Sequence, residues 1–348
     1  MSGHIVNHEA LAAYISDLMQ TQGVPADEAQ IIGEHLVEAE MFGVTSHGVS
    51  RTSTYMKRLH EGVVNAKWSY RIDAETQSIV KWDACNSMGM VTGVKAMQEA
   101  IDRAKESGIC LVAANHSNHF GMAGYYARMA AEQGMLGICI TNAPPNIAPT
   151  GSSRAYMGTN PIALAAPRNG RPVILDMATS VVAMGKLVVA QKLGKAIPEG
   201  WALTAEGKPT TDPNEGVKGT MMPIGGYKGY GLALFVDVFC GILAGAETGP
   251  HMNNLWHDFV NPQNVGHCFC AIDISKFLPL SYFTEKMERM IAEIKALPKI
   301  EGVSEIYMPE EIEFAKRDRA VQEGIPLADA IYNELAEQGR IYGVEMKI

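Results

Sequence analysis

The chain has 348 residues, of which 19% are charged, and its formal net charge is −9. An acidic chain without a basic stripe is not expected to bind the phosphate backbone of nucleic acids. No run of about 18 apolar residues is present, so no membrane-spanning helix is expected. Residues 1–19 lack the basic start and apolar core of a secretory signal. We therefore expect a cytoplasmic protein whose partners include neither nucleic acid nor a membrane.

The six cysteines are scattered through mostly apolar stretches, and no C-x-x-C pair occurs. Buried, reduced thiols are the expected state of such residues. Cys268 and Cys270 alternate along a predicted strand and therefore face the same side, which leaves a functional pair as a minor alternative.

Helical patterns dominate the first 60 residues. Asn7 is positioned to cap one helix. Pro25, followed by Asp27 and Glu28, has the composition of a first helical turn.

From about residue 78 onward, short apolar runs alternate with helix-like segments. Gly108 and Gly134 are each predicted to end a helix, because glycine is favoured just after a helix. Strands are predicted over 78–82, 109–114, 136–141, 162–167, 172–177 and 267–273, and helices over 93–105, 123–133, 179–192, 230–244 and 283–297. This alternation predicts an α/β fold with helices packed against a sheet.

Two segments lie outside this alternation. Residues 198–219 form a loop rich in Pro, Gly, Thr and charge, whose length indicates a functional edge or an interface arm. Residues 309–348 are predicted to form two short helices.

A polar cluster follows the first helical region, in the run Thr45-Ser46-His47-Gly48-Val49-Ser50-Arg51. An arginine guanidinium binds a carboxylate through two parallel hydrogen bonds, and serine or histidine can hold a further oxygen. The run therefore indicates a carboxylate site. The alternative is a helix cap followed by a surface arginine.

A second polar cluster, Asn115-His116-Ser117-Asn118-His119-Phe120-Gly121, follows the predicted strand 109–114. The carboxyl ends of strands are where α/β proteins usually place ligands. A histidine there has a pKa close enough to neutrality to give or take a proton. Two polar loop histidines are the plain alternative. A zinc site at His116 and His119 lacks further ligands with suitable spacing, so no metal is expected.

Three further motifs are weak by themselves. Gly158-Thr159-Asn160-Pro161 is a tight turn that enters a strand. Asp176 lies between a strand and a helix, where it can cap that helix, orient a catalytic histidine or hold a ribose hydroxyl. Lys228 lies in the glycine-rich run 225–231, which suits a phosphate. The usual dinucleotide fingerprint G-x-G-x-x-G is missing from the sequence.

Taken together and in this order, the clusters resemble the malate/L-lactate dehydrogenase family of the non-Rossmann type. Ureidoglycolate and sulfolactate dehydrogenases, diketogulonate reductase and piperideine-carboxylate reductase resemble the same group. The resemblance extends over residues 8–330 and rests on Ser46-His47-Gly48, His119, Gly158-Thr159-Asn160-Pro161, Asp176-Met177-Ala178 and Lys228-Gly229.

The resemblance implies an α/β fold with a mixed, non-Rossmann NAD(P)-binding sheet, and a homodimer or a dimer of dimers. We expect a helical lobe from residues 1–75 together with 305–348. Residues 76–304 are expected to form the α/β cofactor-binding and catalytic region.

The resemblance also implies roles for single residues. His119 matches the general acid or base. Asp176 matches a cofactor contact and, as a residue that can orient a histidine, is also the second catalytic candidate. The expected substrate contacts are Ser46, His47 and Arg51, with Thr159 and Asn160 near the nicotinamide. The expected cofactor contacts are Thr141, Asn142, Met177, Ala178, Lys228, Glu310 and Glu311.

Two departures from the family pattern affect the cofactor. Ala143 stands where relatives often carry a serine that contacts the cofactor. Pro309 is followed by Glu310 and Glu311, where relatives often have Pro-Gly before an acidic residue. Two acids close to the adenosine ribose would repel a 2′-phosphate and accept a 2′-hydroxyl, so NAD is expected in preference to NADP.

The implied reaction is hydride transfer between NAD(P) and a small 2-hydroxy or 2-keto acid, of the malate or L-lactate type. Ureidoglycolate, sulfolactate and a cyclic imino acid remain alternative substrates of the same fold. A nucleotide-binding protein without catalysis and a zinc hydrolase are alternatives of other classes. A dicarboxylate would need a second cation, for which Arg154 and Lys186 are weak candidates.

Overall fold

A sheet of seven strands forms the centre of the computed structural model, which describes residues 3–348. The strands lie in the order β2 (Arg71–Glu75), β3 (Ile79–Asp83), β4 (Ile109–Ser117), β11 (Val265–Asp273), β5 (Met135–Thr141), β6 (Ile162–Ala166) and β7 (Val173–Met177). β3 and β4 run parallel, and the other neighbouring pairs run antiparallel. The predicted α/β fold with a mixed sheet is confirmed.

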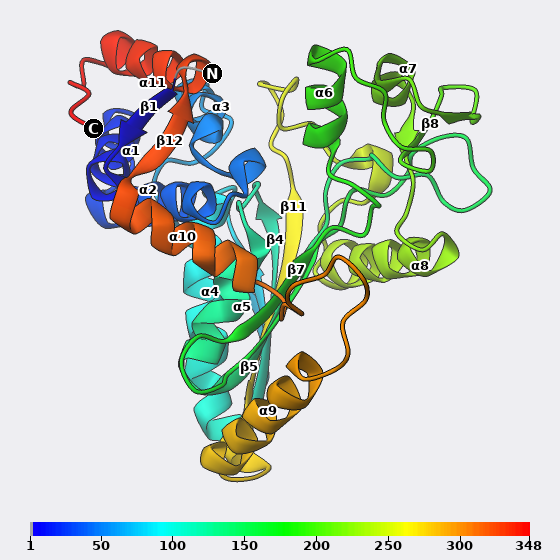
Figure 1. The fold of residues 1–348 in the computed structure, drawn as a ribbon. Coiled ribbons are helices and arrows are strands. Elements are labelled where there is room, and N and C mark those ends of the chain that lie inside the picture. The colour runs from blue at the N-terminus through cyan, green and yellow to red at the C-terminus, as the bar shows by residue number, and fades with distance from the viewer. Residues whose placement is uncertain (1–2) are drawn as a thin grey trace.

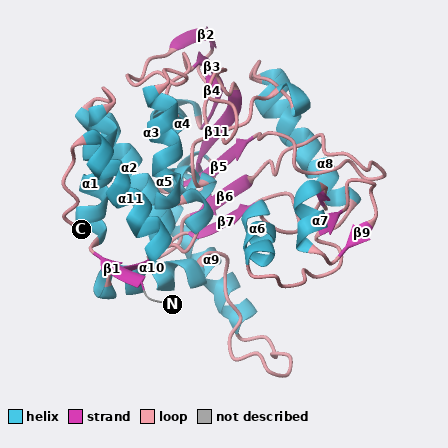
Figure 2. Cartoon of the chain, turned by 90° about the horizontal axis from the view of Figure 1, so that it is seen from above, coloured by secondary structure: helices cyan, strands magenta, loops and turns pink. Residues whose placement is uncertain are grey.

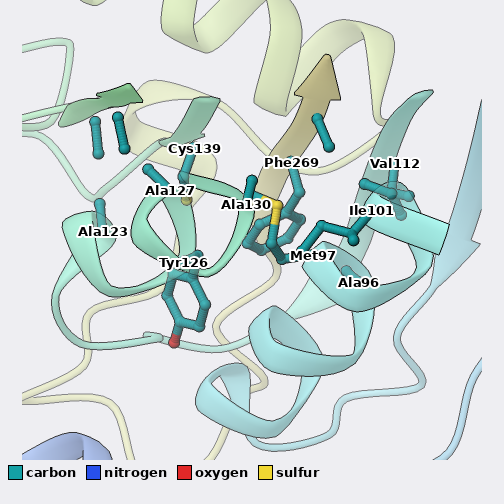
Figure 3. Close-up of a cluster of buried hydrophobic side chains, with 14 of the residues drawn as sticks. Ala96, Met97, Ile101, Val112, Ala123, Tyr126, Ala127, Ala130, Cys139 and Phe269 are labelled. Carbon is teal, nitrogen blue, oxygen red and sulfur yellow. The ribbon is translucent and has the colours of Figure 1, made fainter. Parts of the chain in front are cut away.

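Helices cover both faces of this sheet (Figure 2). α4 (Gly89–Ser107) and α5 (Ala123–Glu132) pack on one face, where Met97, Tyr126 and Phe269 belong to one continuous apolar core (Figure 3). α8 (Tyr227–Val236) continues into a π-helical segment, Asp237–Leu243, on the other face. Cys240 and Cys268 belong to the core on that side. Neighbouring residues of β11 thus supply both cores, because successive side chains of a strand point to opposite faces.

A helical lobe stands beside the sheet (Figure 1). It contains α1 (His8–Thr21), α2 (Ala26–Met41), α3 (Thr52–His60), α10 (Glu311–Glu323) and α11 (Asp329–Tyr342). Its core joins both parts of the chain, with Leu11 and Ile32 packed in the same cluster as Leu335. The short strands β1 (Gly3–Val6) and β12 (Ile325–Ala328) pair antiparallel. The domain boundaries near residues 75 and 305 stay a prediction.

A smaller unit contains α6 (Met184–Lys192), α7 (Pro213–Lys218), and the strands β8 (Ala202–Leu203), β9 (Pro209–Thr210) and β10 (Thr220–Met221). Leu187 and Met221 lie in its core. Residues 198–219, which were predicted as a loop, therefore contain short strands and a helix. α9 (Leu280–Lys295) lies at the opposite end of the sheet from this unit (Figure 1).

The helix predicted over 179–192 begins only at Met184. The N–H of Thr179 donates to the Thr159 carbonyl, and the N–H of Val181 donates to the Met222 carbonyl. These long-range bonds take up the backbone N–H groups of residues 179 and 181, which therefore do not join the helix. The other predicted strands and helices are confirmed to within a few residues at their ends.

The predicted helix ends are also confirmed. The Asn7 side chain accepts the N–H of Ala10 at 2.9 Å and so caps α1. Gly108 ends α4 with a left-handed backbone, φ +83°. Within residues 3–348, no helix combines the length and the apolarity needed to cross a bilayer.

Candidate active site

One cavity of about 950 Å³ lies where the helical lobe, β7 and α6 meet. Its lining comes from segments that are far apart in the sequence, including 44–51, 119–123, 174–178, 183–188, 254–257 and 309–313. Many of the predicted site residues meet there, namely Ser46, His47, Arg51, His119, Thr159, Asp176, Ala178 and Glu310. We call Ser46, His47, Arg51 and His119 the arginine end, and Asp176, Glu310 and Glu313 the acidic end.

The turn that carries the arginine end is fixed to α2. It consists of two short 3-10 segments, Thr45–His47 and Val49–Arg51. The Glu40 carboxylate accepts the N–H of Val49 at 3.1 Å. Gly48 makes this approach possible, because a Cβ there would lie 2.1 Å from Glu40 Oε2.

Arg51 is held so that its guanidinium faces the cavity. Its Nε donates to the Ser46 carbonyl at 2.5 Å, and the guanidinium lies 4.1 Å from the centre of the Trp256 ring. Within residues 3–348, neither terminal nitrogen of Arg51 has a hydrogen-bond or ion-pair partner. Both therefore stay available for a carboxylate.

His119 follows β4 and is fixed on both its backbone and its ring. Its N–H donates to Gln263 Oε1 at 2.9 Å. Its ring Nδ1 lies 2.6 Å from the Tyr55 hydroxyl and 3.3 Å from the N–H of Gly121. Because Nδ1 is engaged in this way, Nε2 is the ring nitrogen left for a ligand.

Burial of the side chains away from water determines which of them carry a charge at the arginine end. Burial lowers the pKa of His119 well below its usual value, and the neighbouring His47 and Arg51 lower that pKa further. Burial, assisted by Arg51, lowers the pKa of His47 to about 4. Burial also raises the pKa of the Tyr55 hydroxyl. At neutral pH both imidazoles are therefore uncharged, and Arg51 supplies the positive charge.

At the acidic end of the cavity, pKa values are raised instead of lowered. Burial raises the pKa of Asp176 to about 6, although its carboxylate accepts the N–H of Gly124 at 2.6 Å. Burial and the nearby Asp176 raise the pKa of Glu310 to about 7. Glu310 has a left-handed backbone, φ +73°. These carboxyl groups are suited to accept hydrogen bonds from hydroxyls.

The hydrogen-bond partner of Asp176 is not one of those expected from the sequence. It binds the start of α5 through Gly124, so it does not cap the helix that follows it in the sequence. Within the described residues it makes no hydrogen bond with His119, whose ring contacts Tyr55 instead. A catalytic role for Asp176 stays a prediction.

Three predicted cofactor residues do not line the cavity. Glu311 pairs with Lys295 at 2.7 Å. Lys228 is exposed at the start of α8, and Met177 lies in the sequence between the lining residues Asp176 and Ala178 without lining the cavity itself. Their contacts with a cofactor stay predictions.

Three further predicted residues, Thr141, Asn142 and Asn160, are buried behind the cavity wall. Thr141 Oγ1 lies 2.7 Å from His267 Nδ1. Asn160 accepts the N–H of Ala143 at 3.0 Å, and Ala143 itself lines the cavity. These residues therefore support the wall, and direct ligand contacts by them stay predictions.

The roof of the arginine end is the arch, which we define as residues 252–263. It rises between α3 and α6 just before β11 (Figure 1, yellow). Arg58 of α3 is buried and donates to the Asp258 carbonyl at 2.5 Å and to the Asn261 carbonyl at 3.4 Å. This guanidinium therefore holds the arch over the cavity.

The sequence-based prediction missed Tyr55, Trp256 and Gln263. A signal existed for Tyr55, because it lies four residues after Arg51 and such residues share a helix face. Trp256 and Gln263 lie in a stretch without a motif and reach the site only through the fold.

No metal site emerges within the part of the chain that the structure describes, where no three His, Cys, Asp or Glu side chains are grouped for an ion. His116 instead pairs with Asp83 at 3.1 Å. The zinc alternative for His116 and His119 therefore finds no third ligand among these residues.

Comparisons of sequence and of fold show which known proteins the chain is similar to. The sequence model of the malate/L-lactate dehydrogenase family matches residues 6–336. Malate dehydrogenase from Pyrococcus horikoshii is 42% identical over 348 residues, which cover 98% of this chain and 96% of that one. The structure of sulfolactate dehydrogenase from Methanocaldococcus jannaschii has a TM-score of 0.94 at 37% identity and covers 99% of this chain and 98% of that chain. Malate dehydrogenase from Entamoeba histolytica has a TM-score of 0.95 at 28% identity and covers 100% of both chains. The chain therefore belongs to the malate/L-lactate dehydrogenase family.

Proposed function

We propose that this chain reduces small 2-keto acids and oxidises the matching 2-hydroxy acids, of the malate or L-lactate type, with NAD. The observation that carries the proposal is the joint placement of Arg51 and His119 at one end of a single cavity. The family, and the names of the malate and sulfolactate dehydrogenases that the chain resembles, support the same class of reaction.

The cavity fits a nicotinamide dinucleotide. The lining includes the small side chains of Ala143, Thr159 and Ala178, which leave room for a flat ring. Asp176 and Glu310 would accept hydrogen bonds from the hydroxyls of a ribose. Their carboxylates, when ionised, would repel a 2′-phosphate. When bound, the cofactor supplies or takes up the hydride. The acidic end thus supports NAD over NADP.

Arg51 orients the acid, and His119 moves the proton. Arg51 would hold the substrate carboxylate through its two free terminal nitrogens. Because Tyr55 engages Nδ1 of His119, Nε2 would donate a proton to the forming alkoxide, or accept one in oxidation. The charge of Arg51 disfavours a protonated His119, and a bound carboxylate offsets that charge. Substrate binding should therefore remove the part of the downward shift in the pKa of His119 that Arg51 causes.

The test is the variant His119→Ala. We expect its kcat to fall about a hundredfold or more while NADH binding is kept, because proton transfer is lost and the cofactor contacts are not. Rates would be followed by NADH absorbance with oxaloacetate, pyruvate and sulfopyruvate, and binding by NADH fluorescence. His116→Ala is the matched control, since this neighbouring histidine does not line the cavity. Normal turnover by His119→Ala would remove the residue from its role. If the unaltered protein reduces no 2-keto acid, the proposed function is wrong.

We also propose a homodimer, or a dimer of such dimers, in the cytoplasm. Leu232, Phe235, Phe239 and Ile242 form an exposed apolar stripe along α8 and the following π-helical segment, and Ile242 is 72% exposed. Such a stripe is typical of an interface, and a second copy of the chain is its simplest occupant. The six cysteines are free thiols, as is usual in a reducing compartment. Light scattering in solution should give the mass of two chains, or of four.

A further inference from the structure

The arch presents two polar side chains to the cavity, Asn254 and His257. The side-chain oxygen of Asn254 accepts the backbone N–H of Trp256 at 2.8 Å and that of His257 at 3.2 Å. These two bonds identify which amide atom is the oxygen. The NH2 group of Asn254 is consequently left as a donor.

Neither side chain uses its donor elsewhere in the part of the chain that the structure describes. There the NH2 group of Asn254 makes no hydrogen bond, and the exposed imidazole of His257 makes no hydrogen bond or ion pair. Both groups are therefore free to bind a ligand that enters the cavity.

The two donors belong to residues 254–257 of the arch, a turn that also contacts Arg51. Trp256 lies between them in the sequence, and its ring stacks on the guanidinium of Arg51 at 4.1 Å. A substrate whose carboxylate is held by Arg51 would therefore lie beside the turn. Asn254 and His257 line the same cavity as Arg51, so the far group of such a substrate would face them.

A second negative charge would find no further arginine or lysine in the cavity lining that the structure describes. Among the described residues, Arg51 is the only arginine or lysine that lines it. Arg154 and Lys186, the candidates from the sequence, do not line it. The first turn of α6 contributes the uncharged Met184 and Gly185.

The turn is held in place before a ligand arrives. Arg58 binds two carbonyls of the arch, and Gln263 at its end accepts the N–H of His119 at 2.9 Å. Binding groups on a fixed segment lose less conformational entropy when they meet a ligand than groups on a mobile one.

We propose that Asn254 and His257 form a subsite for a second anionic group of the substrate, a carboxylate or a sulfonate. The preferred substrates would then be 2-keto acids that carry such a group beyond the keto carbon. The inference rests on the proposed function and adds the class of its substrate. An amide NH2 and an imidazole N–H both donate to the oxygens of these anions, and a protonated imidazole adds a positive charge.

The test compares kcat/KM for oxaloacetate, sulfopyruvate and pyruvate, which share the 2-keto acid group and differ in the second anion. Asn254→Asp keeps an oxygen to hold the turn and replaces the donor by a negatively charged oxygen. We expect this variant to lower kcat/KM about a hundredfold for the two dianions and to leave pyruvate within about threefold.

Substitutions of His257 form the second arm. His257→Ala is expected to lower kcat/KM for the dianions about tenfold, and His257→Lys is expected to restore much of the loss, because it returns a positive donor. His251→Ala is the matched control, since this exposed histidine lies just before the arch and does not line the cavity.

The outcomes separate the two proposals. Equal losses for all three substrates, or unchanged ratios in both Asn254→Asp and His257→Ala, would overturn the subsite. A preference of the unaltered protein for pyruvate over both dianions would overturn it as well and leave the proposed function standing. If the unaltered protein turns over none of the three, the proposed function fails first. A loss confined to oxaloacetate or to sulfopyruvate would support the subsite and identify the anion that it takes.

Discussion

The arginine end and the acidic end of the cavity differ in the sign of their charge, although burial acts on both. At the arginine end burial suppresses the charge of the histidines, lowering the pKa of His47 to about 4, and leaves Arg51 positive. At the acidic end burial raises the pKa of Asp176 to about 6 and of Glu310 to about 7. Burial always disfavours the charged form, so it lowers the pKa of a base and raises that of an acid. Arg51 therefore attracts an anion to its end of the cavity, whereas the acidic end rejects an anion only to the extent that its carboxyl groups are ionised.

The largest expected effect comes from removing the positive charge of the arginine end. Arg51→Gln should lower kcat/KM for 2-keto acids about a thousandfold, because the substrate carboxylate loses the guanidinium that binds it through two hydrogen bonds. NADH affinity, measured by fluorescence, should change little. Arg154→Gln is the control, because Arg154 is exposed and outside the cavity. A loss below about tenfold would mean that another group binds the carboxylate.

At the acidic end, Glu310→Gly should shift the preference between the two cofactors. Glycine suits the left-handed backbone at this position, φ +73°, so the change removes the carboxylate without strain. The ratio of kcat/KM for NADPH to that for NADH should rise about thirtyfold. Glu311→Gln removes a similar charge that is paired with Lys295 outside the cavity, and should leave the ratio unchanged. The same shift in both variants would point to net charge as the cause.

The contact between Tyr55 and His119 predicts a smaller effect. Tyr55→Phe removes the hydroxyl that lies 2.6 Å from His119 Nδ1 and should lower kcat about tenfold, since the ring loses the partner that fixes its protonation pattern. The pH profile of kcat should move as well, which loss of packing alone would not cause. An unchanged profile with a lower yield of folded protein would assign Tyr55 a structural role only.

The smallest expected effect is a pH dependence of cofactor choice. Because the pKa of Glu310 is raised to about 7, this group is mostly neutral at pH 6 and mostly ionised at pH 8. Its repulsion of a 2′-phosphate should grow over that range, so the preference for NADH over NADPH should rise about threefold. In Glu310→Gln the dependence above pH 7 should vanish. Persistence of the full change in that variant would assign it to the phosphate or to another residue.

The sequence was sufficient to predict most of the arginine end. Ser46, His47 and Arg51 lie within one short run of the sequence. His119 follows a strand that its run of apolar residues predicts. Local chemistry singled out these side chains, the family resemblance gave them their expected roles, and the fold brings them to one cavity. The arch was not predictable, because its contribution depends on a contact between Arg58 and carbonyls of residues 258 and 261.

The neighbouring acids Glu310 and Glu311 show where local inference ends. They are identical in type and adjacent in sequence, and both were predicted to contact the cofactor. Only Glu310 lines the cavity, whereas Glu311 turns to Lys295. A left-handed backbone at Glu310 precedes the first turn of α10, and no sequence rule assigns that conformation to a glutamate.

The pairing of β1 with β12 joins Gly3 to Ala328 and Val6 to Ile325, at opposite ends of the chain. The pairing of β1 with β12 in the lobe that carries Arg51 therefore forms only after residues 325–328 have left the ribosome. Contacts of such long sequence separation form slowly, because a large loop must be ordered before they are gained. We expect the sheet to be formed first and the catalytic wall last, so a nascent or prematurely terminated chain would hold no competent active site.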